Sequence, residues 1–320
     1  MEFAGMQEGK YTLKLITTSE HAGHRLDETV AEWLTAKLNR PVSKAKVRKL
    51  LMAGGVYVNG RPVRVPPQRL SSGAKIEAHV DVAKLFGDST SRDKAFELTA
   101  SRILFEDDDL IVVDKPSGLP AHPTLDPARD SLFAAVGRFL AKRDAIEVPY
   151  IGVHQRLDRD TSGIVLFTKS KRVNAAIGEI FSKHTGTKIY QALTVPGRVK
   201  REWTIKNCLG KVRSKSKQAR YGSVTCGGDF AETTFRVIAK YKRGIHLLAV
   251  PKTGRTHQIR VHLSEYGLPI FGDDLYGAGG AERLMLHASQ LIFPHPITGR
   301  EVSIESTLPE DFRRCLNELK

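Results

Sequence analysis

One stretch of this 320-residue chain places a carboxylate where it could do chemistry. Asp158 lies between Arg156 and Arg159, shortly before the apolar run 164–168, which has the composition of a buried strand. A carboxylate held in a loop at the end of a strand could act as a nucleophile or as a general base. The same pattern is also typical of a surface ion pair, so these residues alone leave both interpretations open.

Two other residue pairs indicate different chemistry. Asp158 and Asp160 could form the carboxylate pair of a glycoside hydrolase, but both lie on a single short loop. His257 and His262 could bind a metal ion, but five residues apart on an expected strand they would point to opposite faces. We therefore predict no metal site.

Positive charge is in strong excess, with 50 Lys and Arg against 35 Asp and Glu and a net charge of +15. This excess favours a polyanionic partner such as nucleic acid. No acidic residue occurs between Glu32 and Glu77, and one expected short helix in that segment carries four basic residues without compensating acids. We predict that this helix binds RNA phosphates, with a solvated charged face as the alternative. Its basic residues are Lys44, Lys46, Arg48 and Lys49.

A second basic stretch spans residues 198–220, with Glu202 as its only acid. It includes Lys211 and Arg213, and we predict an exposed insertion that faces RNA. A solvated loop is an equally good interpretation of the same residues.

The rest of the composition is that of an intracellular globular protein. No apolar run approaches the roughly 18 residues of a membrane span, and residues 1–11 lack the apolar core of a signal peptide. The three cysteines show no Cys-x-x-Cys spacing and are expected to be reduced thiols. We expect a cytoplasmic protein without membrane partners, and assume a monomer.

Periodicity and turn chemistry predict a small N-terminal domain over residues 21–82. Apolar residues recur at helical spacing over residues 26–38, and Ser43 is placed to cap a second helix. Residues 56–58 then run into Asn59 and Gly60, the strongest short hairpin signal. Because residues 87–94 are polar and lack periodicity, we place a linker at residues 83–101.

Residues 102–320 predict a larger α+β domain. Short β-rich runs dominate and helices interrupt them irregularly, which favours a mixed, mainly antiparallel sheet flanked by helices over a regular βαβ winding. Helices are expected at residues 131–142 and 171–183. Strands are expected at residues 110–113, 164–168, 189–195, 234–238, 247–250 and 258–262.

Both domains resemble known families. Residues 21–82, with Arg25-Leu26-Asp27 and the later run 55–60, resemble the αL RNA-binding domain that ribosomal small-subunit protein four shares with several RNA-modifying enzymes. Residues 102–308 resemble the RluA family of RNA pseudouridine synthases. The family's arginine, leucine, catalytic aspartate, threonine, serine and glycine match residues 156–163. Further matches fall in residues 112–123, 188–192, 231–235, 254–262, 272–277 and 284–299.

This resemblance implies isomerisation of uridine to pseudouridine within structured RNA. The bond from ribose C1′ to uracil N1 breaks and C5 bonds to C1′, so no cofactor is needed. The target nucleotide must be flipped out of its stack. Large-subunit ribosomal RNA is the first expectation for the substrate and transfer RNA the second, while a non-catalytic RNA-binding protein is the remaining alternative.

The resemblance also assigns roles to residues of this chain. Asp158 is the essential aspartate, although attack on C1′, attack on the base and removal of a ribose proton all stay open. Arg260 matches a buried arginine that would lie beside Asp158 and favour its ionised form. Tyr190 would stack on the target uracil and handle the proton on C5. Arg156 would fill the vacated stack or hold a phosphate.

Two departures affect these assignments. The family places a histidine directly before the arginine, whereas here Gln155 separates His154 from Arg156. The four-residue core also recurs at residues 24–27, where Asp27 opens an amphipathic helix and residues 30–32 do not supply the threonine, serine and glycine of the pattern. We interpret Asp27 as structural. Ser162 favours the RluA family over the sister family acting on small-subunit ribosomal RNA.

Overall fold

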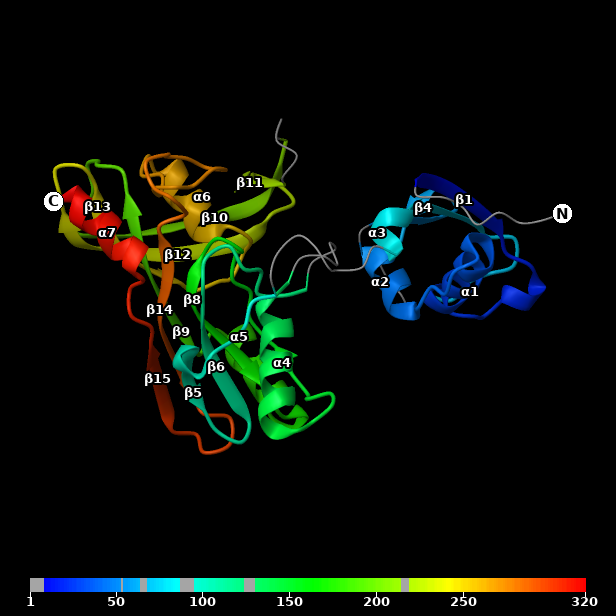
Figure 1. Ribbon diagram of the computed structural model, residues 1–320. Helices are drawn as coiled ribbons and strands as arrows, with labels where there is room; N and C mark the ends of the chain where they lie inside the picture. The colour runs from blue at the N-terminus through cyan, green and yellow to red at the C-terminus, as the bar shows by residue number, and fades with distance from the viewer. Residues whose placement is uncertain (1–8, 53, 64–67, 87–94, 124–129, 214–218) are drawn as a thin grey trace. The chain divides into compact units, whose positions relative to one another are not determined.

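The computed structural model describes residues 9–52, 54–63, 68–86, 95–123, 130–213 and 219–320. The chain divides into two compact units, one with residues 9–86 and one with residues 95–123 and 130–320 (Figure 1). Within the described ranges, no helix has both the length and the apolar character needed to cross a membrane.

The N-terminal unit packs two helices against a four-stranded antiparallel sheet of order β1-β4-β2-β3. The core joins Leu34 of α1, Val47 and Leu51 of α2 and Ile76 of β4, all buried. Ser43 caps α2 by accepting a hydrogen bond from the Lys46 backbone at 3.3 Å, as predicted. The elements are β1 (Lys10–Ile16), a 3-10 helix (Ser19–His21), α1 (Leu26–Leu38), α2 (Lys44–Met52), β2 (Val56–Val58), β3 (Arg61–Pro62), β4 (Lys75–Asp81) and α3 (Val82–Phe86).

The predicted hairpin is confirmed, and one strand was not foreseen. Asn59 and Gly60 have φ of 50° and 77°, the positive values that a two-residue turn between twisted strands requires. Strand β1 begins at Lys10, ahead of the range 21–82, and pairs along its length with β4. Its alternation of exposed and half-buried residues is the strand period of two, so the signal was present in the sequence. Of the expected linker, residues 87–94 lie outside the described residues.

The C-terminal unit, residues 95–123 and 130–320, is α+β, as predicted. Its described residues form an 11-stranded sheet along the path β11-β10-β12-β13-β9-β14-β8-β6-β5, with β15 on β14 and β7 on β8. Among its strand pairs, β8 and β14 run parallel and the others antiparallel. The strands are β5 (Ile103–Glu106), β6 (Leu110–Lys115), β7 (Gly152–Val153), β8 (Ser162–Thr168), β9 (Thr187–Thr194), β10 (Glu202–Val212), β11 (Arg220–Ser223), β12 (Asp229–Lys240), β13 (Ile245–Pro251), β14 (Leu286–Pro294) and β15 (Glu301–Glu305).

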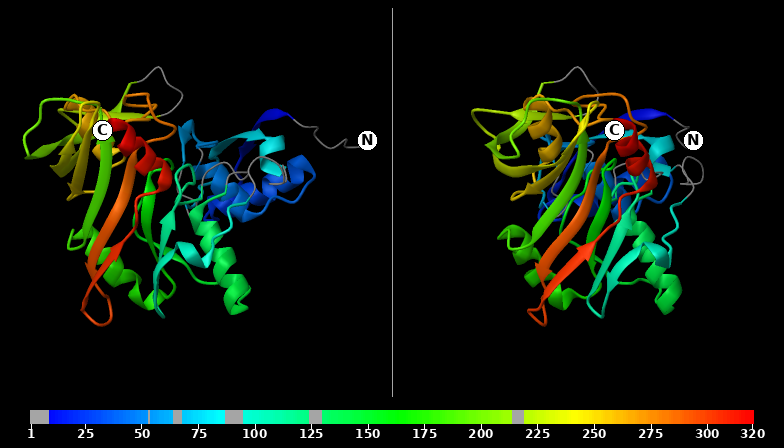
Figure 2. Two further views of the ribbon diagram at one scale, coloured as in Figure 1. Left: turned by 60° about the vertical axis from the view of Figure 1, so that its left-hand side comes forward. Right: turned by 90° about the vertical axis from the view of Figure 1, so that its left-hand side faces the viewer.

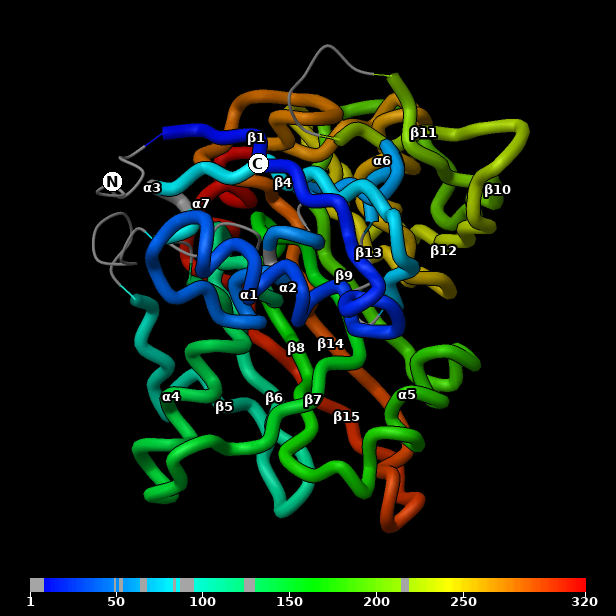
Figure 3. Tube along the Cα trace, turned by 90° about the vertical axis from the view of Figure 1, so that its right-hand side faces the viewer, coloured from blue at the N-terminus to red at the C-terminus, as the bar shows by residue number. Residues whose placement is uncertain are grey.

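Helices cover both faces of β6 and β8. Val113 and Phe167 pack with α4, whereas Val112 and Leu166, one position away on the same strands, pack with α5. Neighbouring strand residues point to opposite faces, so a strand covered on both sides reads as a continuous apolar run. Figure 3 shows the two helices on either side of these strands. The helices of this unit are the 3-10 helices Ala100–Arg102 and Lys171–Val173, α4 (Leu132–Asp144), α5 (Asn174–Ser182), α6 (Gln258–Glu265) and α7 (Glu310–Leu319).

The C-terminal helix closes the far part of the sheet. Phe312, Cys315 and Leu319 of α7 pack with Leu247 of β13 and Leu193 of β9 in one core cluster. Figure 2 shows this helix, in red, lying across the top of the twisted strands. It extends the core over the β9 and β13 part of the sheet.

The strand predicted at residues 258–262 is wrong, because these residues begin helix α6. Six consecutive residues of α6, from Gln258 to Leu263, are buried. A helix enclosed on all sides shows no polar stripe, so its residues lack the 3.6-residue period by which a surface helix is recognised. The other five strands and both helices predicted in this unit are confirmed.

Candidate active site

Asp158 lies in the loop that leads into β8, as predicted. All seven residues of β8 are buried, so the strand is a fixed support for this loop. The Thr161 backbone N–H donates to the Asp158 carbonyl at 3.2 Å and closes a turn. Gly163 has φ of 110°, and a Cβ there would lie 2.2 Å from the Ala288 carbonyl oxygen. Only glycine therefore lets β14 run beside the start of β8.

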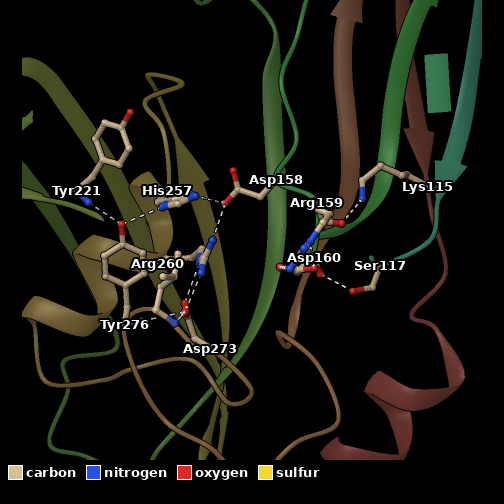
Figure 4. Close-up of polar contacts among 11 residues, drawn as sticks. Lys115, Ser117, Asp158, Arg159, Asp160, Tyr221, His257, Arg260, Asp273 and Tyr276 are labelled. Carbon is tan, nitrogen blue, oxygen red and sulfur yellow. Dashed lines mark hydrogen bonds and ion pairs between the residues drawn. The ribbon is translucent and has the colours of Figure 1, made fainter. Parts of the chain in front are cut away.

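The other end of the loop is held by Lys115, at the end of β6. Its fully buried ammonium donates to three backbone carbonyls, including that of Arg159 at 2.8 Å (Figure 4). Ser117 donates to the Asp160 carbonyl at 2.6 Å. Burial lowers the pKa of Lys115 to about 7. These contacts fix the backbone of Arg159 and Asp160, directly after Asp158.

Helix α6 brings Arg260 to Asp158. Its Nη1 lies 3.2 Å from Asp158 Oδ2, while Nε and Nη2 donate to the two Asp273 oxygens at 2.8 Å each. Burial disfavours the charged guanidinium, but the hydrogen bonds and charge of Asp273, with the charge of Asp158, outweigh it and raise the pKa of Arg260. Arg260 is thus a permanent cation anchored on one carboxylate and directed at another.

His257 and Tyr276 lie on the other side of Asp158 Oδ2. His257 Nε2 is 4.0 Å from that oxygen, and His257 Nδ1 is 2.9 Å from the Tyr276 hydroxyl. The hydroxyl in turn accepts from the Tyr221 backbone N–H at 2.9 Å. Figure 4 shows these side chains leading from β11 to Asp158.

Tyr190 projects from β9 into the cavity that Asp158 also lines. Burial, with the nearby charge of Asp158, raises the pKa of Tyr190, so the phenol is neutral near pH 7. Among the described residues its hydroxyl has no hydrogen-bond partner. A neutral phenol of this kind can offer both an aromatic face and an exchangeable proton.

Asp158, Tyr190, His257 and Arg260 line a cavity of about 360 Å³, within the range of small-molecule sites. Within the part of the chain that the structure describes, no group of three or more His, Cys, Asp or Glu is arranged to hold a metal ion. The lining includes Arg156, Asp158, Lys188, Tyr190, residues 253–260 and Leu286.

Comparison with known proteins decides the family. A family model described as RNA pseudouridylate synthase matches residues 109–265, and an S4 domain model matches residues 25–76. Ribosomal large subunit pseudouridine synthase C of Yersinia pestis is 33% identical over 342 residues, covering 98% of each chain. The protein of that name from Escherichia coli (strain K12) is 32% identical, covering 95% of each. This chain is a pseudouridine synthase of the RluA family.

The pseudouridine synthase is therefore an isomerase that acts on RNA. A solved structure, human RNA pseudouridylate synthase domain containing 4, superposes with a TM-score of 0.58 at 23% identity. It covers 68% of this chain and 93% of its own, which supports the fold of the C-terminal unit.

The alternative chemistries find no support in the geometry of the synthase. Asp160 pairs with Arg159 at 2.8 Å and does not line the cavity, so it forms no carboxylate pair with Asp158. His262 is engaged by Thr233 and Asn207 at 3.0 and 2.9 Å. We expected His257 and His262 on opposite faces of a strand. Instead, His262 lies within α6 and His257 directly precedes this helix.

His154, displaced by Gln155 in the sequence, belongs to the wall of the cavity. Its Nε2 lies 3.2 Å from Asn174 Oδ1 and 3.3 Å from Thr168 Oγ1. Burial lowers the pKa of His154. The ring is thereby tied to α5 and β8. Arg156, by contrast, is exposed at the cavity rim.

Two basic residues of helix α2 of the synthase pair with acids, which the sequence did not indicate, while phosphate binding by this helix stays a prediction. Arg48 donates to Asp27 at 2.8 Å, and Lys44 donates to Glu28 at 2.8 Å. Both acids lie in the first turn of α1, the preceding helix, which packs against α2. Lys46 lies over the Phe86 ring at 4.7 Å, and the side chain of Lys49 lies outside the described residues.

Asp27, the repeated motif's aspartate, is structural. It is buried in the N-terminal unit between Arg25 and Arg48, at 3.0 and 2.8 Å. The hydrogen bond from Arg25, followed by that from Arg48, lowers the pKa of Asp27 to about 2 despite its burial. Lys211 and Arg213 are exposed at the end of β10, where the adjoining residues 214–218 are not described.

Sequence reasoning gave no part in the reaction to four residues of the site: Lys115, His257, Asp273 and Tyr276. All four fall in stretches matched to the family, so the signal was present as a matched position without a function. Their roles depend on contacts between distant segments, which spacing along the chain does not show.

Proposed function

We propose that this synthase flips a uridine of large-subunit ribosomal RNA into the cavity at β8 and isomerises it, with Asp158 as the catalytic carboxylate. The observation that carries the proposal is the state of Asp158. Its Oδ2 is contacted by Arg260 at 3.2 Å, while Oδ1 has no hydrogen-bond partner among the described residues. The carboxylate is fixed through one oxygen and free to react through the other.

Substrate and product are isomers, so the reaction balances without an oxidant or reductant. The bond from C1′ to N1 breaks, the bond from C1′ to C5 forms, C5 loses a proton and N1 gains one. We take Asp158 as a nucleophile that attacks C1′ or the base, with removal of a ribose proton as the alternative in which it acts as a base. All three steps use the ionised carboxylate of Asp158. The positive charge of Arg260 beside it stabilises that anion.

Tyr190 supplies a platform and a proton relay in this proposal. A flipped uracil costs a few kcal/mol to unstack, and stacking on an aromatic ring recovers about 1–3 kcal/mol. The neutral hydroxyl, which has no partner in the part of the chain that the structure describes, is available to exchange its proton as C5 loses one. The Tyr190 ring and Asp158 line the same cavity.

The remaining basic residues would hold the RNA around the target. Arg156 at the cavity rim would fill the vacated stack or bind a phosphate, and exposed Lys211 and Arg213 would contact the backbone. Lys46 of the N-terminal unit, which contains the S4 domain, would also contact the RNA backbone. We place the reaction in the cytoplasm because the relatives of this chain modify ribosomal RNA.

The test of the active site is Asp158→Asn, which removes the anion and keeps the shape. We expect pseudouridine formation to be lost while RNA binding persists. Asp160→Asn, on the same loop but outside the cavity, and Asp27→Asn, in the repeated motif, are controls that retain activity. Near-normal product formation by Asp158→Asn would overturn the assignment.

The test of the substrate is a map of pseudouridines in total RNA from cells with and without the gene. The large-subunit relatives lead us to expect that sites vanish from large-subunit ribosomal RNA. Loss confined to transfer RNA would replace the proposed target and leave the catalytic assignment intact.

A further inference from the structure

His257 is held by a chain of hydrogen bonds that begins on a neighbouring strand (Figure 4). The Tyr221 backbone N–H donates to the Tyr276 hydroxyl at 2.9 Å, and that hydroxyl lies 2.9 Å from His257 Nδ1. His257 itself has φ of 57°, a left-handed conformation that few residues with side chains adopt. Such a backbone at an active site indicates that the position of the side chain matters.

The Tyr276 hydroxyl decides which ring nitrogen of His257 carries the proton. Tyr276 is buried, and its oxygen already accepts from Tyr221. Its own proton needs an acceptor, and among the described residues His257 Nδ1 is the one within hydrogen-bond distance. Burial lowers the pKa of His257, so the ring is neutral near pH 7 and has a single proton. That proton must then be on Nε2.

The Nε2–H group is directed at Asp158. It lies 4.0 Å from Oδ2, the same oxygen that Arg260 contacts at 3.2 Å. This separation exceeds a hydrogen bond, but catalytic hydrogen bonds are often long without substrate and shorten when it binds. Two donors then converge on one oxygen and leave Oδ1 for the reacting nucleotide.

We propose that His257 is a positioning residue for the isomerisation, donating from Nε2–H to Asp158 Oδ2 when RNA is bound and so fixing the direction of Oδ1. The inference rests on the proposed role of Asp158. Tyr276 acts one step behind, by fixing the tautomer of the imidazole.

Two substitutions separate this role from a purely structural one. The amide nitrogen of His257→Gln reaches the position of Nε2, whereas that of His257→Asn ends near Nδ1. The left-handed backbone favours asparagine over glutamine, so a structural role predicts that His257→Asn performs better. The positioning role predicts the reverse order.

Single-turnover rates at saturating RNA give the readout, with RNA affinity measured beside them. We expect His257→Asn to be about ten- to a hundredfold slower with unchanged affinity, the effect of one hydrogen bond to a charged group. His257→Gln should recover most of that loss. Equal rates for the two variants, or a faster His257→Asn, would overturn the proposal.

Nitrogen-15 spectra of the imidazole groups give a test that needs no activity. The wild-type signal of His257, assigned by its absence from His257→Gln, should be that of a neutral ring protonated on Nε2. Tyr276→Phe should convert it to a mixture of tautomers. A wild-type ring protonated on Nδ1 overturns this inference even if Asp158 is catalytic. An active Asp158→Asn overturns the proposed function and with it the positioning role of His257, and leaves the tautomer of the ring as measured.

Discussion

Replacing Arg260 by Gln removes a buried positive charge from between two carboxylates. The Arg260 and Asp273 side chains are 6% and 1% exposed, and two hydrogen bonds of 2.8 Å join them. Removing one partner of a buried pair costs about 3–5 kcal/mol, because the other charge stays buried without it. Asp273 keeps two backbone donors, from Leu275 and Tyr276 at 3.0 Å. We therefore expect Arg260→Gln to lower the free energy of unfolding by about 3 kcal/mol, the lower end of that range.

Calorimetric unfolding of the full chain measures this loss in the transition of the C-terminal unit. In a domain of about 200 residues each kcal/mol changes Tm by about 2–4 °C, so Arg260→Gln should lower Tm by about 6–12 °C. Arg159→Gln is the matched control, since its pair with Asp160 is 43% and 36% exposed and contributes at most about 1 kcal/mol. Equal Tm values for the two variants would refute the reasoning.

The same contact makes the stability depend on pH. Burial opposes ionisation of Asp273, but the hydrogen bonds and charge of Arg260 outweigh it and lower the pKa of Asp273 from its ordinary 3.8. Because the folded pKa lies below the unfolded one, the stabilisation is complete above the unfolded pKa and is lost as pH falls toward the folded value. The Tm difference between wild type and Arg260→Gln should narrow below about pH 4. A difference that stays constant into acid would contradict this account.

Two further predictions concern Tyr190 and helix α2. If the phenol relays the C5 proton, Tyr190→Phe should bind RNA normally but form little product in single-turnover assays, and Tyr190→Leu should lose RNA-dependent stacking as well. Wild-type rates in both variants would remove Tyr190 from the site. On α2, Lys46→Gln should reduce the salt dependence of RNA binding by about one phosphate contact, a change in log–log slope of about 0.7–0.9. Arg48→Gln should instead lower thermal stability, because it leaves buried Asp27 with one partner fewer; an unchanged Tm would argue against that ion pair.

Local patterns along the sequence determined the small unit well. Ser43 and the Asn59-Gly60 pair act within a few residues of the backbone they cap or turn, so their effect does not depend on distant packing. The strand β1 carried an equally local alternation and could have been found. The pairing of Arg48 with Asp27 could not have been predicted from the sequence, because it joins two helices that meet only when the unit folds.

The large unit shows the same division. The apolar run of β8 predicted a buried strand, and the motif before it located Asp158, because both are contiguous in the chain. Helix α6 was mistaken for a strand because burial on every side removes the polar stripe that identifies a helix.

The sequence by itself therefore determined the family and the α+β class and located the carboxylate that we propose as catalytic, each through residues close together in the chain. Tertiary structure decided how that carboxylate is held. The resemblance alone placed Arg260 beside Asp158, but it indicated neither the pairing of Arg260 with Asp273 nor the contact of Lys115 with the Arg159 carbonyl, 44 positions away. Contacts at such separations depend on how the strands and helices pack, and no spacing along the chain encodes them.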